Sequence, residues 1–155
     1  MIIVEFYISN LQKAEQNIKK IENLIVLAQV SKNKRLMLIA LEEIEKTVKN
    51  CISAVLHYEH TIKRAKLSTD ALSNFKTFEQ KSSKNYITPQ ELKTIKDILN
   101  TTKAHNKSPM EFLKHGEIVI LSENQDIIKL PMQKLTTFLS TTKEILIKIK
   151  SKIKR

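Results

Sequence analysis

The scarcity of turn-forming residues constrains this chain more than any other feature. Its 155 residues include one Gly and three Pro. A β fold of many strands needs a turn about every ten residues, and those turns depend on Gly and Pro. Long helices joined by few connections need far fewer turns. We therefore expect an all-α chain: an up-and-down bundle of four to five helices, with one β-hairpin near the C-terminus.

Apolar residues recur every three or four positions along two long segments. This spacing predicts two antiparallel helices over about residues 6–30 and 33–66. The second helix is apolar on more than one side, so we expect it to be the central one. A short third helix follows the capping residues Ser68-Thr69-Asp70. Its predicted buried side consists of Leu72, Phe75 and Phe78.

The sequence Thr88-Pro89-Gln90-Glu91 has the features of a helix start. Thr88 and Glu91 can form a capping box, and Pro suits the first helical position. We expect a fourth helix from here to about His105, which completes a bundle over residues 6–107. The similar sequence Ser108-Pro109-Met110-Glu111 predicts one further helical turn, ended by Gly116.

Two β-branched, apolar runs, Glu117–Leu121 and Ile127–Leu130, flank a polar five-residue link. They predict a β-hairpin over residues 117–130. Because an isolated hairpin is only marginally stable, it should pack on the bundle or pair with another subunit. A last helix is expected over residues 132–154, and its terminal lysines favour the helix dipole. All these elements belong to a single domain, residues 1–155.

The chain is strongly basic, with a formal net charge of +11 from 27 Lys and Arg and 16 Asp and Glu. Residues 143–155 hold six of the basic residues and one Glu, so the rest of the chain is also positively charged. Such a charge favours RNA or another polyanion as a partner. The alternative is that the lysines serve solubility, since only three arginines accompany them.

Several classes of site are excluded by composition. One Gly cannot form a glycine-rich phosphate loop. Cys51 is the only cysteine, so it forms neither an internal disulfide nor a cysteine-based metal site, and we expect it to be buried. His57 and His60 lie three apart on one predicted helix, but no third metal ligand accompanies them. We therefore predict no metal and no cofactor.

The chain shows no signal peptide, and its longest uncharged apolar run in the helical region, residues 36–41, is too short for a membrane span. We expect a cytoplasmic protein without a membrane span. The alternation of Lys and Ile from residue 145 also suggests a membrane-surface helix. That alternative ranks last, because lysines two residues apart are spread around a helix.

The polar run from Asn100 to Ser108 contains the most reactive combination of side chains. His105 is a titratable imidazole, and Lys103 and Lys107 flank it. Histidine can accept a proton from a ribose 2′-hydroxyl while nearby cations hold the phosphate, which would make a metal-free ribonuclease site. The alternative is that His105 and its lysines are ordinary residues of a helix C-terminus, where the dipole favours them.

The helical region resembles the HEPN family over about residues 6–107. The resemblance lies in two antiparallel helices, the second containing Leu41–Glu45 and Ala54–Glu59, then two shorter helices that end in a polar stretch with His105. It implies a helical bundle, often dimeric. Many members are metal-independent RNases with an arginine four to six residues before a histidine, whereas others are inactive RNA-binding proteins or partners of nucleotidyltransferases.

His105 matches the histidine of that motif, but Ile98, Leu99 and Asn100 occupy the three positions expected for the arginine. None of them can bind phosphate through a charged planar fork. We therefore expect a non-catalytic, homodimeric module that binds RNA, another polyanion or a partner protein. The predicted phosphate-binding residues are Lys103, Lys107, Arg64, Lys150, Lys152 and Lys154. The alternative is a metal-independent endoribonuclease with His105 as base and Lys103 or Arg64 in place of the arginine.

Overall fold

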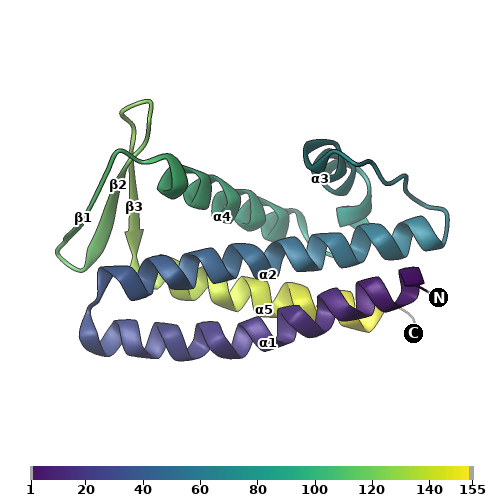
Figure 1. Cartoon of the computed structure of the whole chain (residues 1–155), viewed down its shortest axis with the longest axis horizontal. Coiled ribbons are helices and arrows are strands. Elements are labelled where there is room, and N and C mark those ends of the chain that lie inside the picture. The colour runs from purple at the N-terminus through teal and green to yellow at the C-terminus, as the bar shows by residue number, and fades with distance from the viewer. Residues whose placement is uncertain (1, 154–155) are drawn as a thin grey trace.

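The computed structural model describes residues 2–153, which form a mostly helical fold with a small β-sheet near the C-terminal end (Figure 1). Both the helical class and the C-terminal hairpin predicted from the sequence are confirmed. The elements in chain order are α1 (Ile2–Ser31), α2 (Lys34–Thr61), α3 (Ala71–Gln80), the 3₁₀ helix η1 (Ser82–Asn85), α4 (Pro89–Lys107), β1 (Met110–Lys114), β2 (Glu117–Leu121), β3 (Ile127–Pro131) and α5 (Met132–Lys152).

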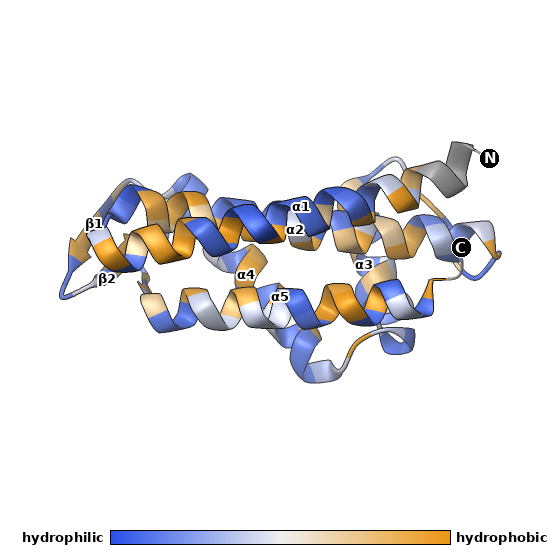
Figure 2. Ribbon diagram, turned by 90° about the horizontal axis from the view of Figure 1, so that it is seen from below, coloured by the Kyte–Doolittle hydropathy of each residue, from blue (hydrophilic) through white to orange (hydrophobic). Residues whose placement is uncertain are grey.

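The long helices α1, α2 and α5 lie side by side, and α4 crosses α2 and α5 (Figure 1). The predicted central position of α2 is confirmed, since it contacts all four other α-helices. Figure 2 shows apolar and polar residues alternating along α1 and α5, as expected for helices that bury one side. One side of α5, with the residue that follows the helix, is buried throughout and comprises Leu135, Phe138, Thr142, Ile145, Ile149 and Ile153.

Local hydrogen bonds explain where the helices begin and end. The side chain of Asn33 accepts a hydrogen bond from Leu36 N (3.2 Å) and starts α2. The capping box of α4 is formed: Glu91 N donates to Thr88 Oγ1 (3.1 Å), and Thr88 N donates to Glu91 Oε1 (2.9 Å). No helix within residues 2–153 combines the length and apolar character needed to cross a membrane.

The predicted end of the second helix at residue 66 is wrong. α2 ends at Thr61, because Lys63 adopts a left-handed backbone conformation (φ 62°). The amides of Arg64 and Ala65 then turn back to donate to Glu59 O (2.7 and 3.3 Å). A helix commonly ends this way at Gly. A lysine at this position gives no such signal in the sequence.

The helical turn predicted over Ser108–Glu111 is also wrong, because Met110–Lys114 is strand β1. It pairs antiparallel with β2, and β2 pairs with β3, so the expected hairpin is part of a three-stranded sheet in the order β1-β2-β3. His115 and Gly116 have φ of 52° and 79° and connect β1 to β2. Positive φ at both turn residues is what a tight hairpin with right-handed strand twist requires. Gly116 therefore ends a strand rather than a helix.

The sheet packs on its own bundle through one face. Ile118, Ile120 and Leu130 point to this side and are fully buried. On the outer face, Met110, Phe112 and Ile127 are exposed, Phe112 at 40%. The sheet lies beside the N-terminal end of α2 in Figure 1, next to the C-terminal end of α4. Its position brings β1 close to the polar run that ends at Ser108.

Candidate ligand-binding groove

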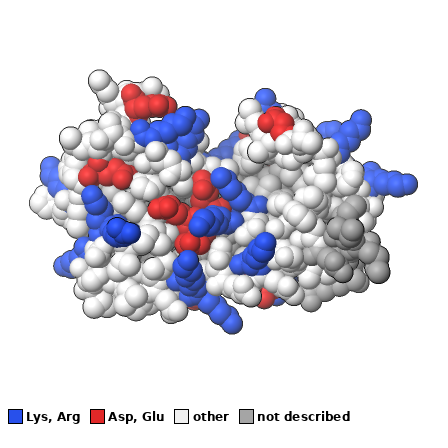
Figure 3. Space-filling view, in the orientation of Figure 1, with Lys and Arg blue, Asp and Glu red and all other residues white. Residues whose placement is uncertain are grey.

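A groove of about 790 Å³ runs between α2, α3 and α4. Its floor is formed by α2, one wall by α4, and the other wall by α3 with the segment that precedes it. Figure 3 shows the surface notched between the part of the molecule that carries α4 and the part that carries α3. It is larger than two other hollows of the described structure, which have volumes of about 560 and 330 Å³.

The groove is charged at one end and apolar at the other. The charged end lies along the C-terminal half of α4, where Lys103 and Lys107 face the middle of α2, which contributes Lys49 and one carboxylate, Glu45. The apolar end lies at α3, which covers the later part of α2. Its lining residues there are Leu56, Leu67, Leu72 and Phe75. Along α2 the groove extends from Glu45 to His57, a distance of about 18 Å at the helical rise per residue.

The three ammonium groups at the charged end are only weakly engaged. Lys49 lies 3.5 Å from Glu45, one helical turn away. Lys107 lies 3.8 Å from Glu123, and both side chains are more than half exposed. Lys103 has no ion pair with a side chain of residues 6–153. Exposed pairs of this kind contribute between zero and about 1 kcal/mol, so all three cations are accessible to an anion.

His57 lines the apolar end of the groove. Its ring lies 4.1 Å from that of Phe6, between centroids. Burial, together with the neighbouring His60, lowers the pKa of His57. The imidazole is therefore uncharged at neutral pH, and the apolar end of the groove has no cation of its own. Among the side chains of residues 6–153, no group of three His, Cys, Asp or Glu is placed to hold a metal.

His105, the predicted catalytic base, lies between two carboxylates. Its Nδ1 is 2.6 Å from Glu111 Oε2, and its Nε2 is 3.5 Å from Glu42 Oε1. The side chain is 15% exposed. A general base needs a nitrogen directed at the substrate proton, and a phosphate would be repelled by the two flanking carboxylates. In this arrangement His105 connects α4 to α2 and β1.

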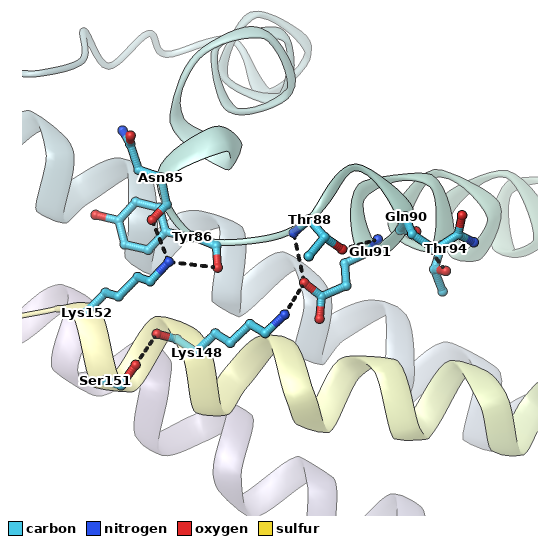
Figure 4. A network of polar contacts seen from close by, with 9 residues as sticks. All are labelled: Asn85, Tyr86, Thr88, Gln90, Glu91, Thr94, Lys148, Ser151 and Lys152. Atoms are coloured by element: carbon cyan, nitrogen blue, oxygen red, sulfur yellow. Dashed lines mark hydrogen bonds and ion pairs between the residues drawn. The ribbon is translucent and has the colours of Figure 1, made fainter.

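The other predicted phosphate-binding residues do not join Lys103 and Lys107. Arg64 lies 3.6 Å from the buried carboxylate of Glu59, which also accepts a hydrogen bond from Tyr86 Oη (3.1 Å). Lys150 is paired with Glu15 of α1 at 2.5 Å. Lys152 donates to Asn85 O at 2.9 Å (Figure 4). Lys154 lies outside the described residues.

Figure 4 shows how the lysines of α5 are used. Lys148 donates to Glu91 Oε1 at 2.7 Å, the same oxygen that completes the capping box of α4. Lys152 reaches the carbonyl groups that precede this helix. These side chains attach α5 to the start of α4, so they act within the fold.

The groove is not predicted by the sequence. Lys103 and Lys107 were expected to bind phosphate and Lys49 was not, and Leu72 was expected to be buried. Leu72 is 64% exposed, because α3 packs against α2 and η1 and turns this side chain towards the groove. Its apolar character had suggested burial, and nothing local distinguishes an apolar residue of a groove from one of the core.

In comparisons with known proteins, the chain matches no family model, no curated protein and no solved structure.

Proposed function

We propose that this protein is a non-catalytic binding module and that its groove takes an anionic partner, with RNA or another polyanion as the first class to test. The observation that carries the proposal is the convergence of Lys49, Lys103 and Lys107, from two helices, at one end of a groove. The charge of +11 attracts polyanions to the whole surface. The groove adds a defined place at which they can bind.

The surroundings of His105 support binding rather than cleavage. Both of its ring nitrogens face carboxylates, and Nδ1 contacts Glu111 Oε2 directly at 2.6 Å. Ile98, Leu99 and Asn100 occupy the positions of the arginine in the HEPN motif, and Ile98 is fully buried. A HEPN-like relationship stays part of the proposal. It is supported by the antiparallel pair of α1 and α2 and by the shorter helices that lead to His105.

The proposal is tested by measuring binding of a labelled mixed RNA pool, and of heparin, at two salt concentrations. The variant Lys103→Glu/Lys107→Glu should lose most of the binding, because it reverses two charges that would contact phosphates. The wild-type binding should weaken as salt rises, because phosphate contacts release counterions. Its matched control is Lys19→Glu/Lys93→Glu, which makes the same change of net charge at two exposed lysines outside the groove. Equal losses in the two variants, or no salt-sensitive binding by the wild type, would contradict the proposal.

The same samples test the endoribonuclease alternative. Incubation of the RNA pool without metal should leave it intact, in the wild type and in His105→Ala alike. Cleavage by the wild type that disappears in His105→Ala would instead establish His105 as a catalytic residue and overturn the non-catalytic assignment.

We further propose that the protein acts as a homodimer in the cytoplasm. The outer face of the sheet supports self-association, since Met110, Phe112 and Ile127 are exposed there and β1 is an unpaired edge within the described sheet. Burial raises the pKa of the Cys51 thiol to about 12, so this lone cysteine is unreactive. Analytical ultracentrifugation should give a dimer for the wild type and a monomer for Phe112→Glu. A wild-type monomer at all concentrations would remove the dimer from the proposal.

A further inference from the structure

We infer that the groove binds a single-headed aliphatic anion, an alkyl chain that ends in a carboxylate or a phosphate. The head group would lie among Lys49, Lys103 and Lys107, and the chain would lie along the floor formed by α2. The inference rests on the proposed function, because it uses the same cationic end of the groove. It goes further in naming the chemistry of the rest of the ligand.

The exposed surface of the groove is mainly apolar, although Ser53 and three asparagines also line it. Ile52 and Leu56 of α2, Leu99 of α4, and Leu67 and Leu72 at the α3 end contribute branched hydrocarbon side chains. Proteins that bind single-stranded nucleic acid in a groove stack its bases on several aromatic side chains. Here Phe75 and the ring of His57 are the aromatic groups in the described lining. The surface therefore favours a flexible alkyl chain over a row of bases.

The distribution of charge gives the ligand a direction. The cations lie at the α4 end, and the α3 end is lined by Leu67, Leu72 and Phe75. His57 lies at that apolar end, and burial lowers its pKa, so it adds no charge there at neutral pH. A ligand with one anionic end and one apolar end matches this asymmetry along the whole groove, whereas a polyanion would occupy its cationic end alone.

The size of the groove fits a small amphiphile. Its volume of about 790 Å³ lies within the range of about 300–1,000 Å³ that is usual for small-molecule sites. Its length along α2, about 18 Å, is enough for an extended dodecanoate ion. Leu72, 64% exposed on the wall of the groove, would be covered by such a chain. Burial of exposed hydrocarbon of this kind is the main source of affinity for an alkyl ligand.

The test is isothermal titration of the full chain with dodecanoate and with dodecyl phosphate, each below its micelle concentration. Saturable binding of one ligand per chain is expected, and the tighter of the two probes identifies the head group. Dodecanol, which lacks the charge, should bind at least about tenfold more weakly, since it loses charge-assisted contacts with the lysines. Failure of both anions to saturate, or equal binding of dodecanol, would overturn the inference.

Two variants locate the ligand. Leu72→Asp places a charge at the apolar end, and its matched control is Val26→Asp on α1, also at a highly exposed apolar residue but outside the groove. Because both side chains are exposed, both variants should fold, which circular dichroism can check. Dodecanoate affinity should fall at least about tenfold in Leu72→Asp and stay unchanged in Val26→Asp. Equal affinity in the two variants would place the ligand elsewhere and overturn the inference.

The polyanion measurements distinguish the two proposals. If RNA or heparin binding depends on Lys103 and Lys107 but dodecanoate does not bind, the inference fails and the proposed function stands. RNA binding that is also lost in Leu72→Asp, without any dodecanoate binding, would make the groove an RNA site and overturn the inference. If neither a polyanion nor an alkyl anion binds, both proposals fail together.

Discussion

The lysines at the end of α4 and the lysines of α5 carry the same charge in different surroundings. Lys148 and Lys152 of α5 hold fixed positions against the start of α4 and the carbonyl groups before it. Lys103 and Lys107 of α4 lie at the rim of a groove, with at most an exposed partner at 3.8 Å. The number of lysines therefore sets the electrostatic field of the protein, whereas the positions of carboxylates and carbonyl groups decide which lysines can bind a ligand.

The pair of Lys148 and Glu91 shows what the α5 lysines contribute. Burial of Glu91 opposes its ionisation, but the hydrogen bonds from Lys148 and from the Thr88 amide outweigh this effect and lower the pKa of Glu91. Glu91 Oε2 is buried without a hydrogen-bond partner within the described structure. Lys148 thus stabilises the ionised form of Glu91, whereas Lys103 pairs with no carboxylate among residues 6–153.

Among these lysines, we expect replacement of Lys148 to have the largest effect on the free energy of unfolding. Lys148→Met leaves the carboxylate of Glu91 without its counter-ion, 8% exposed, and should lower the free energy of unfolding by about 2 kcal/mol. Urea denaturation measures this change. Lys103→Met is the matched control, since it removes the same charge from an exposed position. Equal losses in the two variants would show that the two sets of lysines do not differ.

The second effect is on the dependence of stability on pH. Because the folded pKa of Glu91 lies below its unfolded value, its contribution is present above about pH 4.5 and is lost as the pH falls through the folded pKa. Lys148→Met should reduce this acid-dependent loss, because it removes the hydrogen bond and the charge that lower the pKa of Glu91. Urea denaturation between pH 7 and pH 3 measures it. Glu43, whose pKa Lys20 and Lys46 lower against the effect of burial, should keep the remaining dependence in the variant.

A smaller effect is expected at Lys152, which donates to a backbone carbonyl instead of a buried carboxylate. Lys152→Met removes the hydrogen bond to Asn85 O, and solvent can replace it at this exposed position. The free energy of unfolding should fall by about 0.5–1 kcal/mol, again by urea denaturation. A loss as large as that of Lys148→Met would mean that burial of the accepting group does not affect the contribution of the lysine to stability.

The smallest change in stability belongs to the groove. Lys103→Met should alter the free energy of unfolding by less than about 0.5 kcal/mol, because its side chain is exposed and has no ion pair with the side chains described, those of residues 6–153. The same variant should reduce the salt dependence of polyanion binding by about one phosphate contact. Retention of the full salt dependence would remove Lys103 from the proposed site.

Local sequence patterns determined most of the helical part of this protein. The capping box of Thr88 and Glu91 and the apolar stripe from Leu135 to Ile153 involve residues that are neighbours along the chain, so spacing alone predicts them. The ends of elements were harder to predict. Lys63 adopts a conformation that is typical of Gly, and this conformation depends on the hydrogen bonds that the following amides make to Glu59 O.

Tertiary structure decided the rest, because it depends on residues far apart in sequence. Met110–Lys114 follows a helix-start pattern, yet it forms a strand because the apolar strand β2 offers it a partner. His105 was predictable as a reactive side chain, but Glu42 is distant in sequence and reaches it only through the packing of α2 against α4. The groove likewise needs three helices to exist. The sequence by itself determined the helices and the positive charge, and their packing decided which charges face a site.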